Sequence, residues 1–394
     1  MKKQTQAIHL EYERRDAYDS LSVPVYNTLA YEFDNAAVMA EAFTDKIKAP
    51  DYSRVENPTV TNLERRVAAL TDAAHATAFN SGMAAISNTL MALAAQGKNI
   101  VTSKHLFGNT YALLVATLRR FGVKMRLRDL TNIEAVRETI DDDTCCVFLE
   151  ILTNPQLEVA DLKAISEVAH EKNVPLVVDS TVIPFTQFSA KSLGVDIEVV
   201  SSSKYVSGGA TSLGGLVIDY GTPYNGDFAK RLYGEMLFNF GAYMTPQVAY
   251  MQTIGLETLD ARYRVQSSNA LELAKKLRSL PQIKYVNYVG LEDNPYHELA
   301  QRQFGKTAGA MICIDLESKE ACFSFLNNLK LIHRATNLFD NRSLAIHPAS
   351  TIFGAFSESM RKSMDVKDTT IRLSVGLEDV DDLFEDIKQA VDSL

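Results

Sequence analysis

The sequence predicts an α/β protein with a mostly parallel sheet that is covered by helices on both faces. The main observation is that short apolar runs alternate with helical patterns over much of the chain. At 394 residues, the chain is long enough for about two or three structural units. Its 46% hydrophobic and 23% charged residues are ordinary for a globular protein and exclude wholesale disorder.

The elements follow from the spacing of apolar residues. The first 50 residues show weak periodicity and are interpreted as an extended arm with short helices, one of them at 37–43 with Asp34 as a possible N-cap. Beyond the arm, a helix is predicted from residue 61 and a turn at 80–82. Five strands are then predicted at 100–101, 123–127, 145–149, 176–178 and 197–201. The predicted helices that alternate with them lie at 84–95, 111–121, 133–140 and 161–172, with a short one before Gly194.

The remainder of the chain is interpreted as one further strand and a smaller α+β unit. The patterns predict strands at 213–218, 311–316 and 370–374, and helical segments at 246–280, 319–329 and 380–394. The expected organisation is therefore an arm at 1–55, a large α/β domain at 56–250 and a C-terminal α+β domain at 251–394.

Composition excludes several classes of function. The 40 Lys and Arg residues against 49 Asp and Glu give a net charge of −9, which argues against a nucleic-acid partner because such a partner requires a basic face. No apolar run is long enough to span a membrane and no signal peptide is visible, so we expect a cytoplasmic protein without a membrane partner. The four cysteines and seven histidines show no metal-ligand spacing, so buried thiols and no metal site are expected.

Candidate site residues are polar residues that follow apolar runs, because ligands of open α/β sheets bind at the carboxyl ends of strands. Asp179 ends the apolar run 174–178, and Lys204 follows the strand at 197–201. A carboxylate at a buried strand end needs a cationic partner, and a lysine between serines and glycines is a candidate amine nucleophile. Taken singly, Asp179 fits a helix cap or a structural ion pair equally well, and Lys204 fits a solvated surface residue.

Two other segments are candidates for ligand contacts. The run Asn80-Ser81-Gly82-Met83 opens a helix, where free N–H groups favour a phosphate or carboxylate, although an ordinary N-cap explains it too. The segment 150–154 follows a strand but also ends in a plain turn signal. The glycine-rich stretch 208–215 lacks the context of a dinucleotide-binding fingerprint or a P-loop. Jointly, a lysine amine, a strand-end acid and a phosphate-ready helix start are what pyridoxal 5'-phosphate (PLP) requires.

On these residues, the chain resembles the PLP-dependent enzymes of cysteine and methionine metabolism, which include cystathionine γ-synthase, cystathionine lyases, methionine γ-lyase and O-acetylhomoserine sulfhydrylase. The segments that match the family, in the family's order, are YSRVENPT (52–59), NSGMAAI (80–86), LFGNTY (106–111), EILTNP (150–155), VVDS (177–180), SSSKYVSGG (201–209), GLETL (255–259), IHPAST (346–351) and IRLSVGLE (371–378). The resemblance implies a fold-type I PLP-dependent transferase in which the large domain binds the cofactor.

The resemblance also implies roles for individual residues. Lys204 matches the lysine that holds the cofactor and moves protons among substrate carbons, and Asp179 matches the partner of the pyridine nitrogen. Further cofactor contacts are implied for Tyr52, Arg54, Gly82, Met83, Phe107, Asn154, Ser201 and Ser203, and substrate contacts for Asn154, Asn337 and Arg372. Tyr52 and Arg54 match residues that the family sends to the phosphate of a neighbouring subunit, which implies a homodimer at least and favours a homotetramer.

Several residues depart from the family pattern. Phe107 stands where a tyrosine is usual, so ring stacking survives but the phenol hydroxyl does not. Asn337 takes the place of a serine found in many lyases, and Phe339 takes that of a usual glycine. Ser180 replaces the usual asparagine after the strand-end acid, and the pair at 209–210 replaces a common His-Gly.

These departures favour one reaction over another. A carboxylate, with an acid pKa of about 4, departs unaided more easily than a thiolate, with a pKa of about 8.5, so loss of the phenol favours an O-acylated homoserine substrate. Segments 211–215 and 337–348 also look more like those of the sulfhydrylases. We therefore expect replacement of acetate by sulfide to give homocysteine, with a γ-lyase acting on methionine or cystathionine to give 2-oxobutyrate as the alternative. A non-catalytic cofactor-binding protein is a third hypothesis, against which Lys204, Asp179 and Arg372 argue.

Overall fold

A seven-stranded sheet forms the centre of the computed structural model, which describes residues 1–10, 16–44 and 46–394. Its strands are β1 (His75–Phe79), β2 (Asn99–Thr102), β3 (Lys124–Leu127), β4 (Thr144–Glu150), β5 (Leu176–Asp179), β6 (Ile197–Val200) and β7 (Gly215–Asp219). Their order is β1-β7-β6-β5-β4-β2-β3. Only β7 runs antiparallel to its neighbours, β1 and β6, and the other pairs are parallel. The predicted mostly parallel sheet is therefore confirmed.

Helices cover both faces of this sheet, because alternate strand residues point to opposite sides. In β5, Val177 packs into one buried cluster, whereas Leu176 and Val178 pack into another on the opposite face. The helices associated with the sheet are α3 (Pro58–Thr71), α4 (Gly82–Leu93), α5 (Gly108–Ala112), α6 (Ile133–Thr139), α7 (Leu162–His170), α8 (Phe228–Arg231), α9 (Phe238–Phe240) and α10 (Pro246–Glu257). Strands buried from both sides explain why the sequence shows them as continuous apolar runs.

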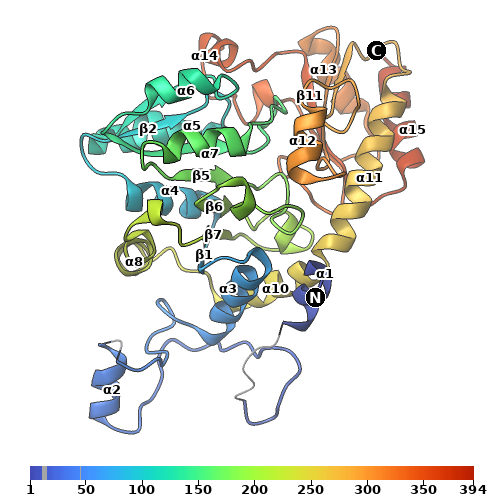
Figure 1. Ribbon diagram of the computed structural model, residues 1–394. Coiled ribbons are helices and arrows are strands. Elements are labelled where there is room, and N and C mark those ends of the chain that lie inside the picture. Colours follow the sequence, from blue (N-terminus) through green and yellow to red (C-terminus); the bar gives the residue numbers. More distant parts are fainter. Residues whose placement is uncertain (11–15, 45) are drawn as a thin grey trace.

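A second, antiparallel sheet lies in the C-terminal part of the chain. It consists of β8 (Tyr285–Asn287), β9 (Met311–Asp315), β10 (Leu344–Ile346) and β11 (Thr370–Ser374) in the order β10-β11-β9-β8. Its helices are α11 (Leu259–Leu277), α12 (His297–Phe304), α13 (Lys319–Asn328), α14 (Glu358–Ser363) and α15 (Val380–Val391). Figure 1 shows α11 rising along the right-hand side from α10 toward the C-terminal helices. The domain boundary predicted at residue 250 falls inside α10.

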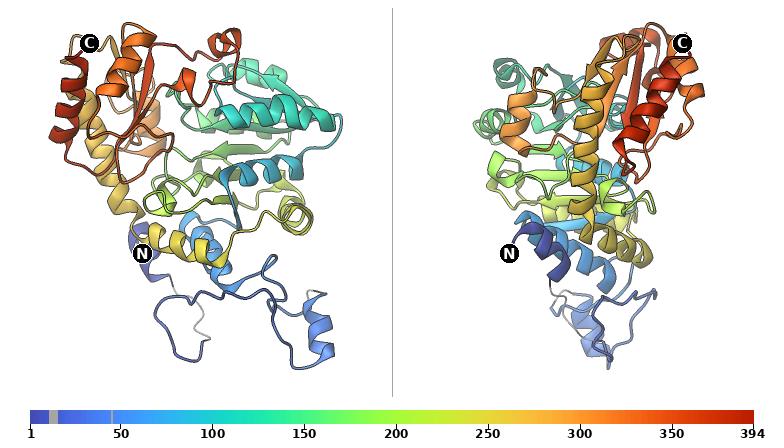
Figure 2. Two further views of the ribbon diagram at one scale, coloured as in Figure 1. Left: turned by 180° about the vertical axis from the view of Figure 1, so that it is seen from behind. Right: turned by 90° about the vertical axis from the view of Figure 1, so that its right-hand side faces the viewer.

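The N-terminal segment carries α1 (Lys3–His9) and α2 (Ala36–Ala42), and the blue stretch with α2 extends away from both sheets in all three views (Figures 1 and 2). Residues 11–15 and 45 of the predicted arm lie outside the described residues. Asp34 as N-cap of the short helix was wrong by one position. Asn35 caps it instead, because its side-chain oxygen accepts hydrogen bonds from the backbone N–H groups of Ala37 and Val38.

The remaining differences from the predicted elements have simple causes. Strand β1 has the sequence HATAF, whose small and polar residues hide its strand character, and it pairs at the sheet edge with β7. Short elements such as β8 and β10 contain three residues each and leave too little pattern to detect. The predicted helical region at 246–280 is two helices that meet at Thr258.

Candidate active site

The carboxyl ends of β4, β5 and β6 meet at one edge of the large sheet and bring together residues that are distant in sequence. Glu150 ends β4 and is the register partner of Asp179, which ends β5. Lys204 follows Val200, the last residue of the neighbouring strand β6. Parallel pairing alone therefore places the predicted acid and the predicted lysine on adjacent strand ends.

The amine of Lys204 is half-buried and is held by the C-terminal part of the chain. Its Nζ donates a hydrogen bond of 2.7 Å to Oδ1 of Asn337. Burial, and then the positive charge of Arg372, lower the pKa of Lys204 to about 8. A larger neutral fraction near physiological pH makes this amine a better nucleophile than an exposed lysine.

Asp179 and Glu150 form a pair of carboxyls at the strand ends. Burial raises the pKa of Asp179, although its Oδ1 accepts a 2.9 Å hydrogen bond from the backbone N–H of Thr181. Burial and the charge of Asp179 raise the pKa of Glu150 well above its usual range. Within the described part of the chain, no cationic side chain pairs with Asp179. The protonated nitrogen of a pyridine ring is a cation that would satisfy it.

Glu150 is a site residue to which the sequence analysis assigned no role. Its Oε1 accepts a hydrogen bond from the backbone N–H of Phe107, so it fixes the start of α5 beside the strand ends. The signal was present in the sequence, because Glu150 directly follows the apolar run 145–149 as Asp179 follows its own run. Thr181, which binds both Asp179 and the N–H of Ser201, was also missed.

The start of α4 lies against the end of β6 and leaves room only for glycine. A Cβ atom placed on Gly82 would lie 2.6 Å from Cβ and 2.7 Å from Oγ of Ser201. The N-cap is Ser81, whose Oγ accepts the N–H of Ala84, and the first turn contains no acidic residue. The first turn of α4, with its free backbone N–H groups and the positive end of the helix dipole, therefore lies beside the Ser201 side chain, which is an arrangement suited to a phosphate.

The structure gives Ser203 a different partner from the one expected. Its hydroxyl accepts a 2.9 Å hydrogen bond from the N–H of Gly214 and donates one of 3.1 Å to the carbonyl of the same residue. Ser203 thus links the glycine-rich stretch 208–215 to the loop that carries Lys204 by hydrogen bonds. The expected contact of Ser203 with a phosphate remains a prediction.

Arg372 is a buried cation for which the described residues supply no anion. It lies on β11 with 2% of its surface exposed, and its guanidinium donates to Oδ1 of Asn154 at 3.2 Å and to the carbonyls of Thr336 and Asn337 at 3.2 and 3.3 Å. Burial lowers the pKa of Arg372 to about 10. No carboxylate among the described residues pairs with it. Because an unpaired buried charge is costly, this guanidinium fits the carboxylate of an amino-acid substrate.

Phe339 has an unusual backbone for its residue type. Its φ is 56°, a value that bulky residues rarely adopt and that glycine adopts without strain. The ring is fully buried and stacks on Tyr205 at a centroid distance of 4.0 Å, and the N–H donates to Oγ of Ser374. The ring stacking and this hydrogen bond offset the backbone strain of Phe339. The stacking also holds Tyr205, which directly follows Lys204, in place.

Tyr52 and Arg54 contact one another, not the cluster around Lys204. The Arg54 guanidinium lies 5.5 Å from the centre of the Tyr52 ring, and its Nη1 donates to the carbonyl of Phe238. Tyr52 is 40% exposed. Both residues belong to the segment that extends from the rest of the chain, so neither is brought to the site of its own subunit by any contact described.

Among the residues that the structure describes, no group of three or more His, Cys, Asp or Glu side chains could hold a metal ion. None of the described helices is long and apolar enough to cross a membrane.

The cluster around Lys204 matches a known family of enzymes. Residues 4–392 match the family described as Cys/Met metabolism PLP-dependent enzyme. The chain belongs to this family. Its cofactor is PLP, and the fold is the fold-type I α/β architecture of that family.

Members of the Cys/Met metabolism family with different activities resemble the chain over nearly its whole length. An L-methionine gamma-lyase of Fusobacterium nucleatum subsp. polymorphum is 37% identical over 99% of this chain and 98% of its own. An O-acetyl-L-homoserine sulfhydrylase of Corynebacterium glutamicum is 31% identical over 98% and 95%. A crystal structure from Campylobacter jejuni, described as an O-acetylhomoserine (thiol)-lyase with N'-pyridoxyl-lysine-5'-monophosphate, has a TM-score of 0.95 at 35% identity and covers 100% of both chains. Family membership therefore makes the chain a PLP-dependent enzyme and leaves both sulfhydrylase and lyase chemistry open.

Proposed function

We propose that this enzyme replaces the acyl group of an O-acylated homoserine by sulfide and so forms homocysteine. The observation that carries the proposal is Phe107, which precedes α5 and bonds Glu150 at the end of β4. Its backbone is anchored to Glu150, and its half-buried side chain has no hydroxyl that could donate a proton to a leaving group. A carboxylate needs no such help, whereas a thiolate does, because their acids differ by about four to five pKa units.

The other side chains fit this reaction. PLP, when bound, supplies an electron sink for the pair of electrons left when a proton is removed from the substrate's α-carbon. Arg372, oriented by Asn154, would hold the substrate carboxylate. The amine of Lys204, freed from the cofactor and held near Asn337, would take the α-proton and return a proton to a neighbouring carbon.

A γ-lyase that acts on methionine or cystathionine is the second candidate. The relatives named methionine gamma-lyase favour it, since they are as similar to this chain as the sulfhydrylases are. The two reactions share the removal of the γ-substituent and differ in what is added afterwards, so residues that bind cofactor and carboxylate do not separate them.

The deciding experiment supplies the purified holoenzyme with O-acetylhomoserine, with and without sulfide, and with methionine alone. Homocysteine that depends on sulfide, with methionine inert, is the expected result. Conversion of methionine to 2-oxobutyrate with little homocysteine from the acyl substrate would replace the proposal by the lyase. A Lys204→Ala variant serves as the control and should lose turnover of every substrate.

We further propose that the enzyme is at least a homodimer in which Tyr52 and Arg54 reach the phosphate of the neighbouring subunit. The extended segment exposes apolar side chains that a second copy would cover, among them Leu21, Leu29 and Phe43. Phe240 is also exposed, and it lies on α9 two residues after Phe238, whose carbonyl accepts a hydrogen bond from Arg54.

Mixing two inactive variants tests the exchange directly. If Arg54 acts across the interface, a hybrid of Lys204→Ala and Arg54→Ala subunits contains one site with both native residues. Subunits mixed at random should then recover about a quarter of the wild-type sites. No recovery, in hybrids whose formation is confirmed by differently tagged subunits, would mean that Arg54 acts within its own subunit or not at all.

A further inference from the structure

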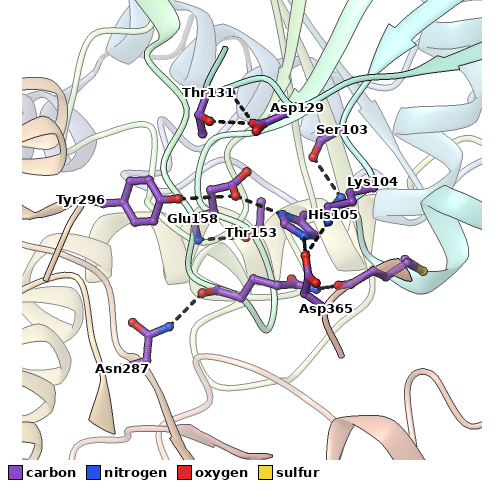
Figure 3. Close-up of polar contacts among 12 residues, drawn as sticks. Ser103, Lys104, His105, Asp129, Thr131, Thr153, Glu158, Asn287, Tyr296 and Asp365 are labelled. Carbon is purple, nitrogen blue, oxygen red and sulfur yellow. Dashed lines mark hydrogen bonds and ion pairs between the residues drawn. The ribbon is translucent and has the colours of Figure 1, made fainter. Parts of the chain in front are cut away.

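A second polar cluster lies close to the active site and has no part in the chemistry described above. It borders a cavity of about 210 Å³ lined by His105, Glu158, Tyr296, Asp365 and Cys313, among others. Figure 3 shows His105 at its centre, between Glu158 and Asp365. Cys313 lies directly opposite Arg372 in the pairing of β9 with β11, so one wall of the cavity adjoins the strand that carries Arg372.

His105 is bonded to a carboxylate through each ring nitrogen. Nδ1 lies 3.1 Å from Oε2 of Glu158, and Nε2 lies 2.8 Å from Oδ2 of Asp365. Ionised carboxylates only accept hydrogen bonds, and a neutral imidazole has one N–H. Both contacts can therefore be made at once only by the imidazolium form of His105.

The three bonded residues come from three segments that each carry a residue of the active site. His105 precedes Phe107 by two residues, and Glu158 lies four residues after Asn154 in the loop that follows β4. Asp365 belongs to the turn after α14, which leads directly into β11 and Arg372.

A second bond joins two of these segments. The side-chain amide of Gln156 donates to the carbonyl of Met364 at 2.6 Å, beside Asp365. Lys104 adds a contact of 2.6 Å to the Asp365 carboxylate, but its side chain is partly exposed. Among the described contacts, His105 bonds both the Glu158 and the Asp365 carboxylates, whereas Gln156 reaches the turn through the Met364 carbonyl and Lys104 through Asp365.

We propose that His105 is a positioning residue that aligns Phe107, Asn154 and Arg372 by bridging Glu158 and Asp365. The inference rests on the proposed function only in assuming that the site binds an amino acid. It does not depend on which γ-substituent leaves or on what is added afterwards.

The bridge should respond to pH in a defined direction. Burial lowers the pKa of His105, but the hydrogen bonds with Glu158 and Asp365 and the charge of Glu158 outweigh it, so that the net pKa is raised. Other charged groups that face the cluster or line its cavity are Lys104, Asp129, Asp315 and Lys367, and the Tyr296 hydroxyl bonds Glu158. A raised pKa means that the bridge is complete below the ordinary histidine pKa of about 6.5 and is lost as pH rises through the higher folded value.

The test measures amino-acid binding to the holoenzyme by the change in cofactor absorption, with L-norvaline as the probe because its side chain has no leaving group. We expect His105→Gln to bind L-norvaline about threefold to tenfold more weakly near pH 6 while retaining the cofactor. Between about pH 6 and pH 9, wild-type binding should weaken relative to that of the variant, since the variant shares every titration except that of His105. Lys104→Gln, which also touches Asp365 but not Glu158, is the matched control: it should bind L-norvaline as the wild type does near pH 6, and its loss of affinity should move to higher pH because the removed cation lowers the pKa of His105.

Two results would overturn the proposal. One is an affinity and a pH profile of His105→Gln that match the wild type. The other is a His105→Gln variant that loses thermal stability and cofactor retention along with L-norvaline affinity while its pH profile stays that of the wild type. That result would make His105 merely structural. Because L-norvaline binding requires no turnover, failure to form homocysteine would refute the proposed reaction without bearing on His105.

Discussion

Replacing Gly82 by alanine probes the junction between α4 and the end of β6. The added Cβ would lie 2.6 Å from Cβ and 2.9 Å from Cα of Ser201, so the obstruction includes the main chain and cannot be relieved by rotating a side chain. Carbon atoms in contact are about 3.5–4.0 Å apart, and the two segments must therefore separate by about 1 Å. Overpacking of this kind costs about 1–3 kcal/mol of folding free energy.

The same displacement should weaken cofactor binding. A hydrogen bond to a charged group contributes about 1.5–3 kcal/mol, and moving the α4 N–H groups by about 1 Å removes roughly one of them. The dissociation constant of PLP should therefore rise about tenfold to a hundredfold. Absorption titration of the apoprotein measures this constant, and urea unfolding of the apoprotein measures stability separately.

Gly234→Ala is the matched control, because a Cβ at Gly234 meets no atom within 4 Å and the residue lies in a helical segment. It should bind PLP as the wild type does and unfold at no lower urea concentration. If Gly82→Ala retains the wild-type affinity for PLP, the junction does not form the phosphate cradle and this reasoning fails.

Three other substitutions or titrations test the rest of the site. In steady-state assays, Arg372→Gln should raise KM for the amino-acid substrate about a hundredfold or more with the cofactor retained, because it removes the buried charge that would pair with the substrate carboxylate. The control Arg342→Gln, which changes an exposed arginine, should leave KM unchanged. The rate of PLP uptake by the apoprotein, followed by stopped-flow absorption, should increase as pH rises toward about 8 and level off beyond it, because only the neutral Lys204 amine is nucleophilic. An inflection of this rate near pH 10.5 would contradict the lowered pKa of Lys204. Phe107→Tyr should increase 2-oxobutyrate formation from methionine, relative to turnover of O-acetylhomoserine, by about tenfold or more. An unchanged ratio would remove the leaving-group argument.

The fold class, and the meeting of candidate site residues at neighbouring strand ends, could be predicted from the sequence for a physical reason. Strands buried on both faces must be continuous apolar runs, so the polar residue that ends each run, such as Asp179, is visible in the sequence. Parallel pairing then requires neighbouring strand ends to meet, which brings Asp179 near Lys204 without any knowledge of side-chain contacts.

What only the tertiary structure decided depends on contacts between segments far apart in the chain. The glycine at position 82 is required by Ser201, and the hydroxyl of Ser203 is bound by Gly214, neither of which has a local pattern. The bridge from Glu158 through His105 to Asp365 joins residues separated by 53 and 260 positions. Sequence periodicity records which face of an element is buried, but the partner it is buried against is set by how the two sheets pack, and so these contacts could be known only from the folded chain.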